Sequence, residues 1–384
     1  MACCGLGVPI AAAGYPRSMP TGASVAVVGA GVLGLSTAHA LAELGASPTV
    51  YESRRPGHGQ SVGEARVFRH GHDDRRLCGH VRDARTLWDE WGERFGTELV
   101  SADGAVALGP AVERRLRVLE EVGGVPVRRI DADELADRLP LLAPYDGPAM
   151  LDERGGAIRA RATIAALAGA LGDAIRLDEV LSLRRTARRS VEILAGAERT
   201  EHERVVLCAG RGTAQLARGI GLDLPVRLAA HARLTFDVRG PAPPRLASLL
   251  DGSGAWGQVG TYASAQPGNG RVALGVFGTV DAREDGSLVD PESLAALGDR
   301  AAAYVREALP GLRPEPVEVV HCWVTTLPWG EDGVAAWDED GVVAVAGNNL
   351  FKQAPWLGRA LARAALGDGL EADLRPESRL GAAS

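Results

Sequence analysis

The sequence predicts an α/β fold with two domains, the second of which is inserted into the first. Two observations carry this prediction. A strand, a glycine-rich turn and a helix begin at Ser24 with the spacing of a dinucleotide-binding unit. Residues 341–366 show a strand, a loop and a helix near the other end, and residues 226–280 alternate as several strands with glycine turns in between. The domain that opens the chain is therefore expected to close it as well.

Length, composition and charge restrict the class of protein. The 384 residues are enough for two domains that each bury a core. Hydrophobic residues make up 46% and charged residues 24%, which is typical of globular proteins and excludes a largely disordered chain. The formal net charge of -7 favours neither a nucleic acid nor an anionic membrane surface as a partner. No apolar run approaches the roughly 20 residues that a membrane-spanning helix needs.

The cysteines and the first residues bear on the compartment. Five cysteines form no disulfide framework and no C-x-x-C metal pattern: Cys3, Cys4, Cys78, Cys208 and Cys322. We therefore expect a reduced, cytoplasmic location and no metal site.

Residues 1–23 lack the basic stretch of a signal peptide. They are expected to be a loose extension, with Met19 as an alternative start.

The glycine-rich turn has the pattern G-x-G-x-x-G between a strand and a helix. Gly29 permits a tight turn, Gly31 lets the backbone approach a pyrophosphate, and Gly34 lets the helix pack closely on the strand. The amides at the helix N-terminus stabilise phosphate groups. Glu52 ends the next strand, 23 positions after Gly29, and would accept a hydrogen bond from a ribose 2′-hydroxyl. The alternative is a glycine-rich turn without a ligand, and the motif alone does not choose between NAD and FAD.

The periodicity of apolar residues predicts the remaining elements. In chain order they are a helix at 81–99, strands at 104–109 and 125–130 around a helix at 111–122, a short helix at 130–140, a hairpin-like turn feeding a helix at 150–171, a β-ribbon at 176–195, a strand and helix at 204–216, and a helix at 290–308. From this order we predict that 24–80, 145–220 and 315–384 form the cofactor domain, and that 81–144 and 221–314 form the inserted domain.

Four later segments carry a more specific pattern: QSVGEARVFRH (60–70), VVLCAG (205–210), CWVT (322–325) and NNLFKQAPWLG (348–358). With these segments the chain resembles the FAD-dependent amine oxidases of the D-amino-acid-oxidase superfamily, in the branch of monomeric sarcosine oxidase and N-methyltryptophan oxidase. The resemblance runs from about Ser24 to about Leu366. It implies a Rossmann-like FAD-binding domain of the glutathione-reductase type. The inserted substrate domain would be an α+β domain built on a mixed or antiparallel sheet.

The resemblance assigns roles to two of these segments. Ser61 and Arg66 would lie beside the cofactor, with Arg66 next to the flavin ring, and Arg69 would reach the substrate carboxylate. A planar guanidinium suits that task because it pairs with a carboxylate through two parallel hydrogen bonds. Lys352 would approach the carboxylate from the opposite side, and the loop from Gly347 to Lys352 would face the flavin C2 carbonyl. The alternatives are solvated arginines on a loop and a plain surface lysine.

Cys322 belongs to a C-x-x-T pattern that ends at Thr325. In the branch that this pattern resembles, the thiol is bonded to the 8α methyl group of the flavin. The resemblance therefore implies FAD held covalently through Cys322. The alternative is a buried, unreactive cysteine, which is the usual role of a free thiol and the role expected for Cys208.

One position departs from the branch. An alignment on Tyr262, which has a counterpart there and is kept as a candidate catalytic residue, puts Ala273 where the branch has the lysine that activates oxygen. Phe277 falls where sarcosine oxidase has a histidine of the substrate pocket. The nearest cation along the strand is Arg271, two residues before Ala273 and so on the same strand face. The electron acceptor therefore stays open.

The function that the resemblance implies is FAD-dependent oxidation of the C–N bond of an amino acid to an imine, with a secondary or cyclic amine favoured. Electrons would pass to oxygen and form hydrogen peroxide. The alternative is a flavin dehydrogenase or a specialised biosynthetic oxidoreductase with another acceptor, because of Ala273. A flavin-binding or scaffold protein without turnover is a third possibility. An NAD-only dehydrogenase is least favoured, since it has no use for the C-terminal return to the cofactor domain.

Overall fold

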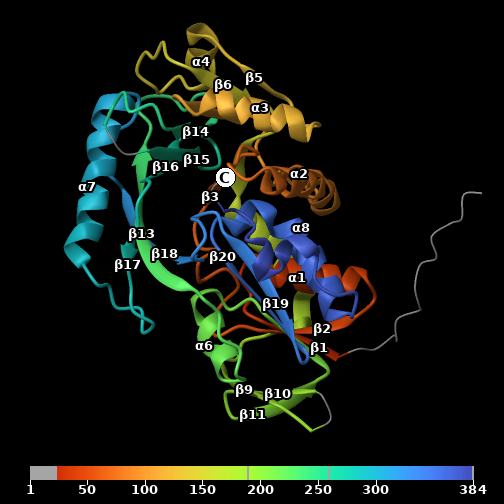
Figure 1. The fold of residues 1–384 in the computed structure, drawn as a ribbon. Helices are drawn as coiled ribbons and strands as arrows, with labels where there is room; N and C mark the ends of the chain where they lie inside the picture. Colours follow the sequence, from red (N-terminus) through yellow and green to blue (C-terminus); the bar gives the residue numbers. More distant parts are fainter. Residues whose placement is uncertain (1–23, 188–189, 258–259, 383–384) are drawn as a thin grey trace, which may run out of the picture.

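The computed structural model describes residues 24–187, 190–257 and 260–382 (Figure 1). The extension expected at residues 1–23, with Met19, lies outside the described residues. Two large sheets organise the described chain, one of six strands and one of nine. No helix in the described ranges is long and apolar enough to cross a membrane.

The six-stranded sheet has the order β19-β20-β12-β1-β2-β8 and is parallel except for β19. Its strands are β1 (Ser24–Val28), β2 (Ser47–Tyr51), β8 (Ile175–Arg176), β12 (Arg204–Leu207), β19 (Val334–Glu339) and β20 (Val342–Gly347). β1 from the start of the described chain and β20 from near its end both pair with β12, so segments from the two ends of the chain form one sheet. Strands buried on both faces read as continuous apolar runs, as β1 and β20 do.

Each face of this sheet is covered by a different layer. Helices α1 (Val32–Glu43), α5 (Ala160–Leu171) and α8 (Ala354–Ala365) pack on one face around Val25 and Val27. The other face, with Ala26 and Val28, packs on α6 (Thr213–Arg218) and on a three-stranded sheet of β9 (Val180–Arg185), β10 (Val191–Ala195) and β11 (Glu198–His202). The predicted β-ribbon is this small sheet.

The nine-stranded sheet is mixed, as predicted, and all its pairs are antiparallel except β4 with β14. Its strands are β4 (Ala105–Leu108), β5 (Val127–Arg129), β6 (Ala149–Asp152), β13 (Arg227–Asp237), β14 (Ser248–Asp251), β15 (Thr261–Ala265), β16 (Arg271–Val276), β17 (Val280–Asp281) and β18 (Glu318–Thr326). Helix α7 (Pro291–Ala308) covers one face. Helices α2 (Arg75–Phe95) and α3 (Val112–Val122) pack near the other face, and α4 (Ala132–Arg138) lies at the same end (Figure 1).

Strand pairing differs from the sequence prediction in two places. The segment at 150–159 is not a hairpin: β6 pairs with β4 and β5, while β7 (Gly156–Arg159) pairs with β3 (Ala65–Phe68) in a separate sheet. β6 and β18 both join the nine-stranded sheet, whereas the predicted boundaries at 145 and 315 place them in the cofactor domain. The physical reason is that a strand's partner depends on long-range packing, which its own pattern does not encode.

Helix α2 starts earlier than predicted because it has a clear N-terminal cap. The side chain of Asp74 accepts a hydrogen bond from the amide of Arg76, so the helix begins six residues before position 81. It ends at Gly96, whose left-handed backbone (φ +62°) closes the last turn. This longer helix matters for the site, because its N-terminal residues lie next to the loop that carries His72.

Candidate active site

The glycine-rich turn between β1 and α1 leaves no room for side chains at its three glycines. Gly29 has a φ of +100°, and a Cβ there would lie 2.5 Å from the carbonyl oxygen of Cys208. A Cβ on Gly34 would overlap the carbonyl oxygen of Gly29, and one on Gly31 would lie 3.2 Å from Ser61 Oγ. Strand β12, the turn and the start of α1 are therefore in direct contact, which is the packing that a dinucleotide-binding turn requires.

Two polar side chains complete this turn. Ser61 Oγ accepts a hydrogen bond from the Val32 amide (2.9 Å), so a residue 29 positions away caps α1, whose own N-cap position is a glycine. Glu52 Oε2 accepts a hydrogen bond from the Ala30 amide (2.8 Å) and thereby sits beside the turn. A carboxylate has further acceptor positions for a hydroxyl group. Turn, helix N-terminus and Glu52 together fit the adenosine and pyrophosphate half of a dinucleotide.

Two arginines, the half-buried Arg66 and the buried Arg233, lie next to each other. Arg66 on β3 and Arg233 on β13 both donate hydrogen bonds to the carbonyl oxygen of Val62. Both guanidinium groups crowd against Gly63, where an added Cβ would lie 2.9 Å from Arg66 Nη1 and closer still to Arg233. Burial and then the neighbouring Arg233 lower the pKa of Arg66 to about 10. Within the described residues neither arginine forms an ion pair with an acidic side chain, so their positive charge is not offset locally.

Cys322 lies at this same place. On β18 it stands opposite His231 of β13, and 9% of its surface is exposed. Tyr262 of β15 is hydrogen-bonded through its hydroxyl to His231 Nδ1 (3.0 Å). Burial and the neighbouring Cys322 raise the pKa of Tyr262, while burial and Arg233 lower the pKa of His231 to about 4, so both side chains are neutral near pH 7.

The C-x-x-T pattern also ties β18 to the end of β20. Thr325 Oγ1 donates a hydrogen bond to the carbonyl oxygen of Gly347 (2.9 Å). Gly347 has a φ of +154° and leads into the turn at Leu350–Gln353 that carries Lys352. The structure thus brings together three segments that the sequence analysis singled out separately: the arginine segment on β3, the cysteine on β18 and the loop after β20.

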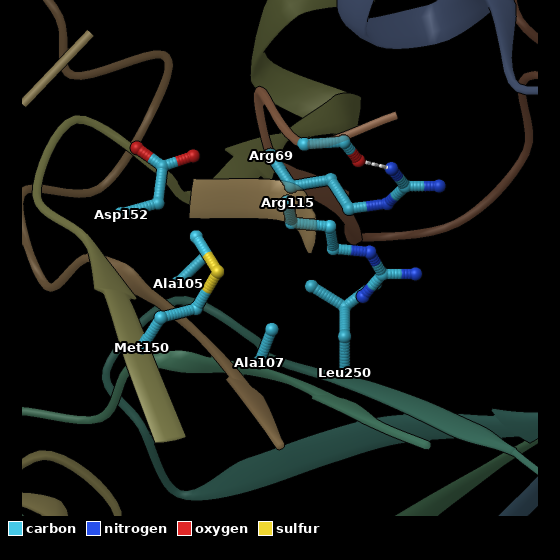
Figure 2. Close-up of a pocket in the computed structure, with 8 residues that line it drawn as sticks. Arg69, Ala105, Ala107, Arg115, Met150, Asp152 and Leu250 are labelled. Carbon is cyan, nitrogen blue, oxygen red and sulfur yellow. Dashed lines mark hydrogen bonds between the residues drawn. The ribbon is translucent and has the colours of Figure 1, made fainter. Parts of the chain in front are cut away.

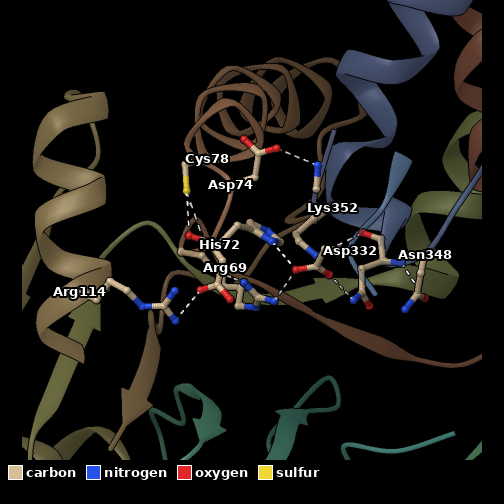
Figure 3. Close-up of polar contacts among 12 residues, drawn as sticks. Arg69, His72, Asp74, Cys78, Arg114, Asp332, Asn348 and Lys352 are labelled. Atoms are coloured by element: carbon tan, nitrogen blue, oxygen red, sulfur yellow. Dashed lines mark hydrogen bonds and ion pairs between the residues drawn. The ribbon is translucent and has the colours of Figure 1, made fainter. Parts of the chain in front are cut away.

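A third cluster surrounds the carboxylate of Asp332, in the loop between β18 and β19 (Figure 3). Asp332 Oδ2 lies 2.7 Å from His72 Nδ1 and 3.4 Å from Arg69 Nη2. Its Oδ1 accepts a hydrogen bond from Asn349 Nδ2 (2.7 Å), and Lys352 Nζ donates to the carbonyl oxygen of Asn349 (3.2 Å). Arg69, predicted to hold a substrate carboxylate together with Lys352, is thus paired with a carboxylate of the chain itself, and the charge of that carboxylate also acts on Lys352.

The buried side chains set the charges of this cluster. Burial and the charge of Arg69 lower the pKa of Lys352 to about 7. Burial and Arg69 lower the pKa of His72 to about 3, so the imidazole is neutral and its Nδ1–H donates to Asp332. Burial favours a protonated Asp332, but His72, Arg69 and Lys352 together hold its pKa well below the usual range. When Lys352 is protonated, its charge and that of Arg69 therefore both act on the carboxylate of Asp332.

The indole of Trp88 fixes the backbone that carries Lys352. Its Nε1–H donates to the carbonyl oxygen of Lys352 (2.8 Å), and Phe351 stacks over the same indole at 6.3 Å. Asn349 turns the chain with a φ of +56° just before this point. The ammonium group is consequently held inside the protein, with 4% of the residue exposed, and is not a surface lysine.

Arg271, the nearest cation to Ala273 along the strand, lies away from the buried residues of the site. Its side chain is more than half exposed and pairs with Asp237 at the surface (2.9 Å). Arg233, one strand away on β13, is the buried cation near Tyr262, with 7% exposed. Ala273 is buried between Thr235 and Ser264. Phe277 is half exposed and stacks on Tyr262 at 6.0 Å.

Sequence reasoning missed three residues of the site: His72, Arg233 and Asp332. His72 had a weak signal, since it follows the predicted Arg69 by three positions. Arg233 and Asp332 had none, because a charged residue in a strand or loop is usually solvated. No group of three or more His, Cys, Asp or Glu side chains in the described part of the chain is arranged to hold a metal ion.

Comparisons with known proteins place these features in context. The family model described as "DAO: FAD dependent oxidoreductase" matches residues 24–364. Peroxisomal sarcosine oxidase of Homo sapiens is 25% identical over 361 residues, which cover 87% of this chain and 90% of the relative. Among solved structures, NikD, an unusual amino acid oxidase essential for nikkomycin biosynthesis, is similar with a TM-score of 0.77 and 22% identity, covering 94% of this chain and 98% of the other.

The L-proline dehydrogenase of P. horikoshii has the same TM-score of 0.77 at 17% identity, covering 92% of this chain and 96% of the other. At these identities the two structures establish the shared fold alone. They include one protein called an oxidase and one called a dehydrogenase.

Proposed function

Because the chain belongs to the DAO family of FAD-dependent oxidoreductases, we propose that it oxidises the C–N bond of an amino acid to an imine. A secondary or cyclic amine is the favoured substrate, and oxygen, reduced to hydrogen peroxide, is the favoured acceptor. The observation that carries the proposal is that the half-buried Arg69 and the buried Lys352 both act electrostatically on one carboxylate, Asp332. Two cations beside one acid leave charge for a second carboxylate, which an amino acid supplies.

The residues present fit FAD. Gly29, Gly31, Gly34, Glu52 and Ser61 would hold its adenosine and pyrophosphate, while Arg66 and Gly347 would lie at the ring. When bound, FAD supplies the acceptor for a hydride from the substrate carbon. Arg66 and Arg233, which form no ion pair with an acidic side chain among the described residues, would stabilise the negative charge that the ring gains.

We also propose that Cys322 tethers the flavin. Its Sγ would bond to the 8α carbon, the thiol and the methyl group would each lose one hydrogen, and the two electrons would leave through the ring to the acceptor. Support comes from the position of Cys322, whose neighbours include the unpaired Arg66 and the neutral Tyr262. A cytoplasmic location belongs to the same proposal and is supported by Cys78, Cys208 and Cys322, all free thiols.

The substrate would be positioned mainly by charge. Arg69 and Lys352 would bind the carboxylate, and His72 and Asp332 would orient the guanidinium of Arg69. Tyr262, neutral and hydrogen-bonded to His231, would face the ring region and contact an uncharged amine. Holding the substrate carbon close to its acceptor supplies much of the catalysis in such a design.

The test of this proposal is anaerobic mixing of the purified yellow protein with amino acids that differ in the amine: N-methyl, cyclic and primary. We expect N-methyl or cyclic amino acids to bleach the flavin absorbance and to leave an imine or its hydrolysis product. The corresponding amines without a carboxylate are the control and are expected to leave the colour unchanged. If no amino acid bleaches the flavin, the protein is a flavin-binding protein without this turnover.

The second candidate, a dehydrogenase that uses another acceptor, is favoured by Ala273 and by the exposed position of Arg271. We expect Ala273→Lys to speed reoxidation of the reduced protein by oxygen. Oxygen gains negative charge when it is reduced, and the added ammonium group would stabilise that charge. Ala273→Met, of similar length and without charge, is the control. Stopped-flow mixing with oxygen measures the rate. If both variants match the wild type, Ala273 does not face the reacting flavin, or Arg233 already supplies the charge.

The affinity for carboxylate ligands is expected to depend on pH through Lys352. Below a pH of about 7 the ammonium group is charged and attracts the ligand. As the pH rises above about 7 the free protein loses this proton, and the affinity should fall by up to about tenfold per pH unit. Titrations of an unreactive carboxylate, followed by the change in flavin absorbance, measure the effect. Lys352→Arg stays charged and should flatten the profile; an unchanged slope in that variant would contradict the assignment.

A further inference from the structure

A small recess lies beside the Arg69 cluster, between α3 and the nine-stranded sheet (Figure 2). The space between its side chains is about 260 Å³, open solvent at the mouth included. Its walls come from the loop after β3, from α3 and from strands β4, β6 and β14: Arg69, Gly71, Ala105, Ala107, Arg115, Met150, Asp152 and Leu250. One wall is apolar and the other carries two guanidinium groups.

The apolar wall is one row of side chains across the sheet. Met150 of β6 stands opposite Ala107 of β4, Ala107 is paired with Leu250 of β14, and Leu250 stands opposite Tyr262 of β15. Residues that pair across neighbouring strands point to the same face. The row therefore leads from the recess to Tyr262, which neighbours the cluster of Arg66 and Cys322. Recess and proposed flavin site share one face of one sheet.

Arg115 is an arginine of the recess that forms no ion pair in the part of the chain that the structure describes. It comes from α3 and packs over Gly71. A Cβ added to Gly71 would lie 3.6 Å from the Cδ of Arg115. Its Nε is buried and has no hydrogen-bond partner among the described residues. Arg114, its neighbour in the sequence, forms an ion pair with Asp73 (2.8 Å). Figure 2 shows the side chains of Arg69 and Arg115 extending in the same direction beside the apolar wall.

No ion pair within the described residues neutralises the positive charge of Arg115. Burial and then the charge of Arg69 lower the pKa of Arg115, and the more distant carboxylates of Asp73 and Asp332 offset this only in part. Arg69 has Asp332 and the carbonyl oxygen of Gly71 as partners, and Arg115 has no corresponding partner in the described part of the chain. Asp152 also borders the recess, but its carboxylate is taken up by His70 (2.8 Å). A partly buried cation without a partner costs free energy, and an anionic group of a ligand would offset that cost.

We propose that Arg115 binds a second acidic group of the substrate, so that the substrate is an amino acid with two carboxylates. This inference rests on the proposed function. The α-carboxylate is held by Arg69 and Lys352, the methylene groups of the side chain lie against Met150 and Leu250, and the second carboxylate pairs with Arg115. The small volume favours a short spacer between the two acids.

Calorimetric titration of the FAD-loaded protein with glutarate and with pentanoate tests this proposal. The two ligands have the same number of carbon atoms, and only glutarate has a second carboxylate. We expect the wild type to bind glutarate about tenfold more tightly or better, since a charge-assisted pair in a partly buried site is worth that much. Arg115→Gln should remove the difference and leave the affinity for pentanoate unchanged. Arg114→Gln, which breaks only a surface ion pair, should keep the difference.

A further variant covers the case in which Arg115→Gln does not fold. Arg115→Lys keeps the charge without the fork of donors and should retain a reduced preference for glutarate. Equal affinity of the wild type for both ligands, or an unchanged preference in Arg115→Gln, would overturn the inference. Flavin bleaching by N-methyl amino acids separates the two proposals. Bleaching without a preference for glutarate removes only the second acid site, whereas a preference without bleaching by any amino acid removes the oxidase function.

Discussion

Replacing Arg69 by alanine is expected to weaken the binding of carboxylate ligands by about 2 kcal/mol or more, because it removes a half-buried charged donor from the site. Lys352→Ala should have an effect of the same size at a pH below about 7, where the ammonium group is charged. The dissociation constant of an unreactive carboxylate, taken from the flavin absorbance, measures both. The loss should appear in the affinity for acids and not in the amount of bound flavin.

The control for these variants is Arg271→Ala. Arg271 is also an arginine in an ion pair, but it lies at the surface with Asp237. We expect its replacement to leave carboxylate affinity unchanged. Thermal melting of the loaded protein accompanies the series, since Arg69→Ala removes the arginine that pairs with Asp332 and leaves that carboxylate with His72 and Asn349. Unchanged carboxylate affinity in both site variants would remove the proposed clamp.

Acid precipitation of the loaded wild type is expected to carry the yellow colour into the pellet, and Cys322→Ala is expected to release all of it to the supernatant. The reason is that a thioether survives denaturation, whereas non-covalent contacts are lost. Cys208→Ala is the matched control. Cys208 is also a buried free thiol, but burial raises its pKa to about 12, and it packs under the glycine-rich turn. This variant should keep the colour in the pellet.

Colour released from the wild type would contradict the tether. Cys322 would then be a small buried side chain of β18, and FAD would be held by the turn at Gly29 and its neighbours alone. Retention in the pellet by both the wild type and Cys322→Ala would point to another attachment site. The outcome does not affect the family assignment, which rests on the match over residues 24–364.

Local sequence patterns predicted the parts of the fold that local physics decides. The turn at Gly29 has the close contacts that its spacing indicates, because only glycine fits where three backbone segments touch. The α/β class and the mixed second sheet are confirmed. The errors came where partners are distant. The segment at 150–159 joins two sheets, and β18 pairs with β13.

The sequence by itself determined the family, the cofactor and the residue types that a carboxylate-binding flavoprotein needs, because each of these is written in short motifs with fixed spacing. Only the tertiary structure decided which charges face one another. It paired Asp332 with Arg69 and His72, left Arg233 beside Arg66 without an acid in the described chain, and set Arg115 at an apolar wall. The physical reason is that the state of a buried charge depends on all its neighbours in space, and these come from segments far apart in the chain.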